Sequence, residues 1–196
     1  RGRADGVAIV TFGGAAQVVL GPTSARDEGL LIDAIDRLRH GDQAGANELL
    51  TRANESAPSV AGTLNGTPFS ELRDGDDLLG TVLEVMSRGK YYWLPLDQVD
   101  SIAMNPPKFP RDLIWVPARL TMRSGESGEV YLPALYHGTA KHADEAIRLG
   151  RSTDWVQAEN GPVLGVGRKS FLCGEDSNSI LDWRELIIEG EDHTPA

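Results

Sequence analysis

The chain contains a single cysteine, Cys173, and no uninterrupted apolar run long enough to cross a membrane. One cysteine excludes an internal disulfide and suits a reducing compartment, although this count alone is also compatible with secretion. Residues 7–24 form the longest nearly uncharged stretch, but glycines and a proline interrupt it. No signal peptide is visible. We therefore expect a cytoplasmic protein with no membrane partner.

Basic residues are scarce relative to acidic ones, with 19 Lys and Arg against 29 Asp and Glu and a formal charge of −10. The basic residues are scattered along the chain, so a surface of this charge repels a phosphate backbone. We therefore expect no nucleic-acid partner, and basic peptides or neutral helices are better candidates. Apolar residues at 40% and charged residues at 24% are typical of a folded globular protein.

Recognised catalytic and cofactor motifs are also missing. Residues 161–170 resemble a phosphate loop, but Arg168 separates the glycine from the Lys-Ser pair that the Walker pattern requires. His137 and His142 lie near acidic residues, yet their spacing matches no known zinc or iron arrangement. Neither Ser124 nor Ser127 occupies a nucleophile elbow. We therefore predict no catalytic, cofactor-binding or metal-binding residue.

Helical periodicity is present near the start. Residues 24–58 predict two antiparallel helices with a turn at Gly41 and Asp42 and an end at Pro58. The second half of this hairpin looks like the closing half of a tetratricopeptide repeat. One such hairpin cannot bury both of its faces, so further helices or another domain must cover it. Because the sequence begins with Arg1, we expect a fragment whose N-terminal part is missing.

After Pro58 the composition changes to turns and β-formers. Asn65-Gly66 predicts a small hairpin, and a third helix is expected from Asp74 or Asp76 to Arg88. Strands are expected over 91–96, 99–104, 113–122, 129–135, 163–166, 170–173 and 183–188, with a short helix over 141–149. The predicted fold class is α+β, with a helical, tetratricopeptide-like N-terminal part over 1–58 and a β-rich C-terminal domain with short helices over 59–196.

Aromatic residues concentrate between residues 89 and 136, where titratable groups are few. This pattern is typical of a β core or a docking face, because catalysis needs titratable groups that converge on one pocket. We expect Trp93 and Trp115 in the core. Pro117 predicts that its strand lies at a sheet edge or carries a bulge.

Several separate blocks recur in one order over most of the chain. They are GTLNGTPF (62–69), YYWLP (91–95), PP (106–107), RDLIWVPARLT (111–121), GEVYLPALY (128–136), LGRSTDW (149–155) and GPVLGVG (161–167). These blocks closely resemble the ImpE family, also called TagJ or SciE, an accessory component of bacterial type VI secretion systems. Members of that family usually carry more helices ahead of the region that matches residues 1–21.

The resemblance implies a non-enzymatic cytoplasmic adaptor. Such a protein would bind a helical segment of the small contractile-sheath subunit and would thereby be linked, directly or indirectly, to the AAA+ disassembly ATPase. The resemblance supplies no motif for the contacting residues. From the sequence itself, the candidates for partner contact are Leu31, Ile35 and Leu38 on the first helix, and Tyr91 and Tyr92 in the aromatic run.

Two other functions stay open at this stage. A small-molecule hydrolase would bring carboxylates such as Asp74, Asp112 and Asp154 together in one acidic pocket. A structural dimerisation module would instead use an exposed strand edge or helix face.

Overall fold

The computed structural model describes residues 9–12, 16–20 and 28–190, and strands predominate in these residues. The helices are α1 (Glu28–Arg39), α2 (Gln43–Glu55) and α3 (Glu145–Arg148), with 3-10 turns η1 (Leu96–Gln98), η2 (Pro110–Leu113), η3 (Thr139–Lys141) and η4 (Ile180–Asp182). The strands are β1 (Ile9–Phe12), β2 (Ala16–Leu20), β3 (Gly62–Leu64), β4 (Thr67–Phe69), β5 (Leu72–Asp74), β6 (Val82–Ser87), β7 (Lys90–Pro95), β8 (Val99–Met104), β9 (Trp115–Met122), β10 (Ser127–Pro133), β11 (Thr153–Gln157), β12 (Val163–Gly167), β13 (Ser170–Cys173), β14 (Asp176–Ser179) and β15 (Glu185–Ile188).

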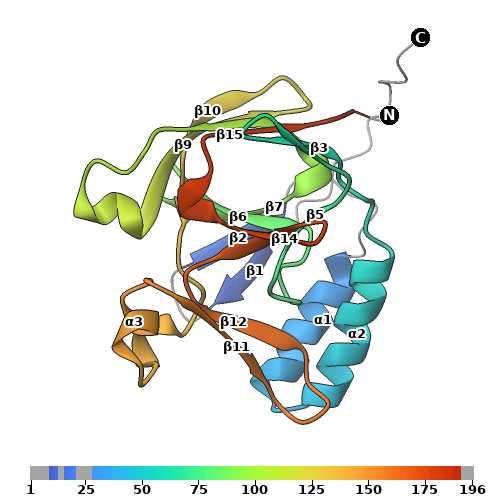
Figure 1. The fold of residues 1–196 in the computed structure, drawn as a ribbon. Helices are drawn as coiled ribbons and strands as arrows, with labels where there is room; N and C mark the ends of the chain where they lie inside the picture. The colour runs from blue at the N-terminus through green and yellow to red at the C-terminus, as the bar shows by residue number, and fades with distance from the viewer. Residues whose placement is uncertain (1–8, 13–15, 21–27, 191–196) are drawn as a thin grey trace, which may run out of the picture.

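Ten strands form the main sheet, in the order β1-β2-β7-β6-β10-β9-β8-β15-β3-β4. Its pairings are antiparallel except for that between β2 and β7. Smaller sheets pair β11 with β12 and order β14-β13-β5. In Figure 1 the main sheet folds over, so that β9, β10 and β15 lie above β6 and β7.

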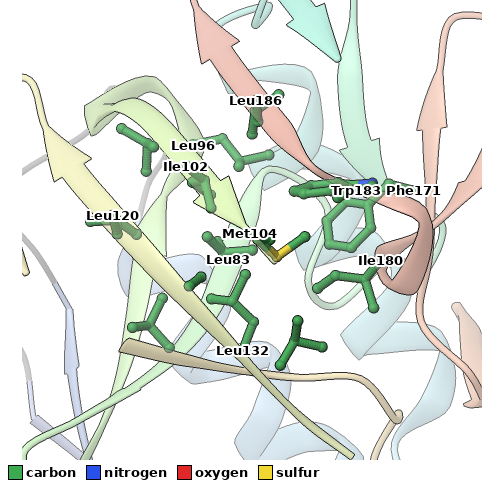
Figure 2. Packing of buried hydrophobic residues seen from close by; sticks show 14 of the residues in the cluster. Leu83, Leu96, Ile102, Met104, Leu120, Leu132, Phe171, Ile180, Trp183 and Leu186 are labelled. Atoms are coloured by element: carbon green, nitrogen blue, oxygen red, sulfur yellow. The ribbon is translucent and has the colours of Figure 1, made fainter. Parts of the chain in front are cut away.

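The space enclosed by the folded sheet is filled by apolar side chains. Strand alternation directs Leu83 of β6, Leu120 of β9 and Leu132 of β10 to this inner face, where all three are buried. Figure 2 shows the labelled side chains of these strands pointing toward one another. At one end the rings of Phe171 and Trp183 lie 4.5 Å apart between centroids. The fold therefore has its main core inside the sheet.

The two predicted N-terminal helices are confirmed. The chain turns at Gly41, which has a φ of +81°, and Asp42 caps α2 by accepting a hydrogen bond from the Gly45 N–H at 3.0 Å. Leu31 and Ile35 of α1 are buried in a second core cluster with Trp93 of β7. The sheet therefore covers the face of the hairpin that a repeat array would have covered.

The predicted fold class is wrong for this reason. The described residues form a mostly β structure, and no tetratricopeptide-like helical domain is present among them, since a single hairpin packs directly on strands. A crystal structure with a similar fold, described below, supports this correction. The division into residues 1–58 and 59–196 stays a prediction.

The predicted helix over 74–88 is also wrong, because this segment forms β5, a turn and β6. The Asp74 side chain accepts a hydrogen bond from the Asp76 N–H at 2.9 Å, and this bends the chain away from a helix. Arg88 and Gly89 both have positive φ angles, of 50° and 74°, and form the two-residue turn between β6 and β7. The glycine interpreted as a helix end therefore closes a β-hairpin.

Other strand predictions had mixed outcomes. The hairpin at Asn65-Gly66 and the strands that became β7 to β10, β12, β13 and β15 are confirmed within a few residues, whereas β11 and β14 were not anticipated. The helix predicted over 141–149 is the shorter α3, which Asp144 caps in place of Thr139. The expected edge position of β9 is wrong, because β9 lies between β8 and β10. The pairing of β9 with β8 runs from Met122 back to Ala118 and does not reach Pro117, which has no N–H group to donate.

The inner and outer faces of the sheet should respond very differently to truncation. Ile102 of β8 is 1% exposed on the inner face, and Ile187 of β15 is 43% exposed on the outer face. Because a buried Ile→Ala change leaves a cavity, Ile102→Ala should lower the free energy of unfolding by about 2–5 kcal/mol. The matched change Ile187→Ala should cost less than about 1 kcal/mol. Urea unfolding of both variants measures this, and equal losses would contradict the assignment of faces.

Candidate partner-binding site

A row of apolar side chains follows the cross-strand register over four neighbouring strands of the main sheet. The register places Tyr91 of β7 opposite Met86 of β6, Met86 opposite Tyr131 of β10, and Tyr131 opposite Pro117 of β9. Directly opposite residues project from the same face of a sheet, so these four form one line that we call the cross-strand row. Tyr131 is 44% exposed, and the other three are half-buried.

The row is extended at its β9 end by further exposed apolar residues. Trp115 lies opposite Pro133 and is 39% exposed, so its predicted burial in the core is wrong. Phe109, Leu113 and Ile114, in and around η2, are also exposed. This end of the outer face therefore presents several exposed apolar side chains.

Asp112 holds the η2 segment in place. Its Oδ2 atom accepts hydrogen bonds from the backbone N–H groups of Lys108 and Phe109, each at 3.0 Å. The bond from Lys108 is the largest of several contributions that keep the pKa of Asp112 below its ordinary value. The carboxylate therefore has a structural role in positioning Phe109.

At its β7 end the row enters a pocket of about 380 Å³. The wall is mainly apolar and aromatic, and the residues that line it are Asp76, Leu78, Leu79, Glu84, Met86, Tyr91, Trp93, Tyr136 and His137. Met86 and Tyr91 belong to both the pocket and the row. Trp93 donates a hydrogen bond from Nε1 to the Tyr91 hydroxyl at 2.9 Å, which fixes two of the rings relative to each other.

A buried charge cluster lies behind the pocket. Lys169 is 2% exposed, and its Nζ forms an ion pair with Glu84 Oε2 and lies 3.8 Å from Asp74 Oδ2. The Tyr136 hydroxyl donates to Asp74 Oδ1 at 2.6 Å and accepts from the Ser170 N–H at 3.1 Å. These contacts connect β6, β5 and the start of β13.

Asp76 joins the pocket wall to β12. Its Oδ1 accepts from the Leu78 N–H and its Oδ2 from the Gly165 N–H, both at 2.8 Å. Gly165 is required here, because a Cβ at this position would lie 2.5 Å from the Tyr136 ring. The carboxylates of this region therefore hold loops and strands together.

Burial dominates the titration of this cluster. It raises the pKa of Asp74 to about 7 against the opposing effect of Lys169, and it raises the pKa of Asp76 as well. Burial alone would lower the pKa of Lys169, but the charges of Glu84 and Asp74 outweigh it and the pKa rises. Lys169 is thus a permanent buried cation at neutral pH.

The residues predicted for partner contact occupy different environments. Leu31 and Ile35 are buried against the sheet, and Leu38 is half-buried. Tyr92 packs against the inner core, while Tyr91 lies on the opposite face, half-buried against the second core cluster and lining the pocket. Contact of these five residues with a partner stays a prediction. Sequence reasoning missed Met86, Tyr131 and Pro117 as site residues, and only the alternation of residues 127–133 could have indicated an outward Tyr131.

The carboxylates proposed for a hydrolase do not gather in this pocket. Asp74 is buried in the charge cluster, Asp112 holds η2, and Asp154 is exposed on β11 with an oxygen 3.6 Å from His142 Nε2. None of the three lines the pocket. Within residues 9–12, 16–20 and 28–190, no group of three or more His, Cys, Asp and Glu is placed to hold a metal ion.

Comparison with known proteins identifies the family. Residues 66–187 match the family described as ImpE protein. The chain belongs to the ImpE family. Over 159 residues it is 39% identical to the type VI secretion system accessory component TagJ of Pseudomonas aeruginosa, and the match covers 81% of this chain and 54% of TagJ. This ImpE chain therefore spans about half the length of that relative.

A solved structure shows the same fold. The crystal structure of protein VPA1032 from Vibrio parahaemolyticus superposes with a TM-score of 0.80 at 29% identity, over 91% of this chain and 66% of that one.

Among the residues that the structure describes, no helix is long and apolar enough to cross a membrane. The chain is thus a member of a family that includes a type VI secretion accessory component.

The raised pKa of Asp74 predicts a pH-dependent stability. The folded state keeps a proton up to about pH 7 that the unfolded chain releases near its ordinary pKa of 3.8, so stability should fall as the pH rises through this window. A single group contributes a slope of at most about 1.4 kcal/mol per pH unit. The free energy of unfolding should therefore be lower at pH 8 than at pH 5.

Asp74→Asn should remove much of this slope, since it replaces the titrating group with a neutral one of the same shape. Asp33→Asn is the matched control, because Asp33 is exposed on α1 and should leave the slope unchanged. Urea unfolding between pH 5 and pH 8 measures both. Identical slopes in the two variants would show that Asp74 does not carry the effect.

Proposed function

We propose that this ImpE chain is a non-enzymatic adaptor of a bacterial type VI secretion system in the cytoplasm. On this proposal, the cross-strand row binds a helical segment of the small contractile-sheath subunit. Family membership supports the system, and the observation that carries the binding mode is the unbroken line of Tyr91, Met86, Tyr131 and Pro117 across four strands.

The spacing of the row fits a helix that lies across the strands. Neighbouring strands are about 4.8 Å apart, and an α-helix rises 5.4 Å per turn. A helix that crosses two neighbouring strands therefore sets one apolar residue, at i and then at i+3 or i+4, close to each of them. Tyr91 and Met86 form one such pair on β7 and β6, and Tyr131 and Pro117 form another on β10 and β9.

The composition of the row also fits a protein interface. Tyrosine, tryptophan and methionine are enriched in interface cores, because they bury a large area at a small cost in side-chain entropy. Tyr131 and Trp115 keep 44% and 39% of their surface exposed, although they neighbour other apolar groups. A contiguous apolar surface of this kind is typical of an interaction site.

The pocket chemistry supports a role without catalysis. No serine, threonine, cysteine or lysine is among the described residues that line it. Both carboxylate oxygens of Asp76 accept hydrogen bonds from backbone N–H groups, and Glu84 forms an ion pair with Lys169. Asp76 and Glu84 are therefore poorly placed to act as general base, and His137 has no serine, threonine or cysteine beside it among the described lining residues to activate.

The link to the AAA+ disassembly ATPase is the second part of the proposal. It rests on the family resemblance, and it requires that a bound sheath segment leave another surface of the adaptor accessible. The row uses only the outer face of β6, β7, β9 and β10, so the outer faces of β8 and β15, with Ile187 exposed, stay open for such a contact.

The binding mode predicts which variants lose affinity. The amino-terminal helix of the cognate small sheath subunit, titrated as a peptide in a calorimeter, should bind saturably. Tyr131→Ala and Met86→Ala should each weaken binding about fivefold or more, because each removes an anchor contact worth about 1 kcal/mol or more. Leu149→Ala is the control, since Leu149 is 54% exposed outside the row and the pocket.

Thermal unfolding of each variant should show that the fold is intact. Absence of peptide binding to the wild-type chain would contradict the proposal, and so would equal losses in all three variants. Light scattering on the same samples addresses the dimerisation alternative. If the chain is a dimer that Tyr131→Ala dissociates, the row is a self-association surface instead.

A further inference from the structure

The pocket at the β7 end of the row contains both aromatic rings and carboxylates. A purely apolar ligand would not require the carboxylates. Its wall contains the rings of Tyr91, Trp93 and Tyr136, and it also contains the carboxylates of Asp76 and Glu84. Aromatic faces and carboxylates both attract cations, and together they form the usual surroundings of a bound ammonium or guanidinium group. This pairing indicates a ligand with an apolar stem and a positive end.

Carboxyl groups outnumber cations around the pocket. Asp74, which keeps a proton up to about pH 7, Asp76 and Glu84 surround one cation, Lys169. Only Asp76 and Glu84 of these four line the pocket, whereas Lys169 lies behind the wall and is 2% exposed. Among the described residues that line it, the pocket wall therefore has two carboxylates and no lysine or arginine.

Glu84 is placed to bind a second cation. Its Oε2 atom pairs with Lys169, while its Oε1 atom accepts no hydrogen bond from any residue that the structure describes. The same cluster already holds one cation against a ring, since Lys169 Nζ lies 5.2 Å from the Tyr136 ring centroid. A cation in the pocket would use the same two kinds of contact from the open side.

The size of the pocket limits the occupant. A volume of about 380 Å³ lies at the small end of ligand sites, which suits one long side chain and excludes a whole helix. Because Met86 and Tyr91 belong to both surfaces, a segment on the row passes directly over the pocket mouth. The stem of lysine or arginine can pack on apolar walls while its charged end reaches a carboxylate.

We infer that this pocket receives one arginine or lysine side chain from the polypeptide segment that lies on the cross-strand row. The aromatic rings and Leu78 contact its stem, and Glu84 and Asp76 neutralise its charge. The inference deepens the proposed function and rests on it for the source of the side chain. The pocket's preference for a cation can be tested without any partner.

The first test uses hexylguanidinium as a probe and hexylurea as its neutral isostere. The indole N–H of Trp93, which donates to Tyr91, is the reporter in nitrogen-15 NMR spectra of the full chain. Hexylguanidinium should shift this signal saturably at about millimolar concentration, as expected for a ligand of this size. Hexylurea should bind about tenfold more weakly. Equal binding of the two probes, or no shift with either, would overturn the inference.

Matched variants locate the effect. Tyr91→Leu removes a pocket ring and should reduce the preference for the cation at least threefold, whereas Tyr131→Leu changes a ring outside the pocket and should leave it unchanged. Glu84→Gln alone would remove the closest partner of the buried Lys169. It is therefore combined with Lys169→Met, so that the double variant lacks both charges. In that double variant the preference for the cation should fall at least threefold, since Asp76 and the rings remain, and an undiminished preference would contradict the role of Glu84.

A final comparison separates this inference from the proposed function. The sheath-subunit peptide is titrated as such and with each of its basic residues replaced in turn by glutamine. One replacement should weaken binding about tenfold, and this loss should be at least threefold smaller in the double variant. If the peptide binds and no replacement matters, the pocket inference fails and the adaptor function stands. If hexylguanidinium binds and the peptide does not, the pocket stands and the proposed partner is wrong.

Discussion

The buried ammonium group of Lys169 is the constraint on which the arrangement of the outer face depends. A cation removed from water in this way must be matched by carboxylates, because an unpaired buried charge costs several kcal/mol. Glu84 and Asp74 supply that match from β6 and from the end of β5, and Tyr136 orients Asp74 through its hydroxyl. Three segments distant in sequence are thereby held at one point, directly behind the pocket wall. Loss of Lys169 alone would leave two carboxylates facing each other in an apolar interior.

Strand β6 connects the buried ion pair to the cross-strand row. β6 forms an extended hairpin with β7, but it meets β10 at the single pair of Met86 and Tyr131. The cross-strand row passes through this pair, so the two halves of the row stay aligned only while β6 keeps its register. Glu84 and Met86 project from the same face of β6, two residues apart. The ion pair of the first therefore fixes the place of the second, which joins the pocket to the row.

The sequence predicted local structure better than it predicted the site. Turn residues at Gly41 and Asn65-Gly66 specify hairpins within a few residues, and period-2 alternation specifies β8 to β10. The segment around Leu83 to Met86 was misassigned, since its apolar spacing also fits a helix and only its pairing with β7 and β10 decides the matter. Trp115 was expected in the core, but strand alternation with buried Val116 places it outside. The row depends on a pairing between residues 86 and 131, and no local pattern encodes a contact of that range.

A face rather than an edge of the sheet is the better surface for a partner helix. The edge strand β4 has Pro68 at its centre, which lacks the N–H group that an added strand would need. Strand addition there is blocked, whereas the outer face presents side chains already held in register by the neighbouring strands. A helix that docks on such a face does not have to order the adaptor, so less of the binding free energy is lost to conformational entropy. On the proposed function, the fixed register of β6 would therefore contribute to the affinity for a partner helix.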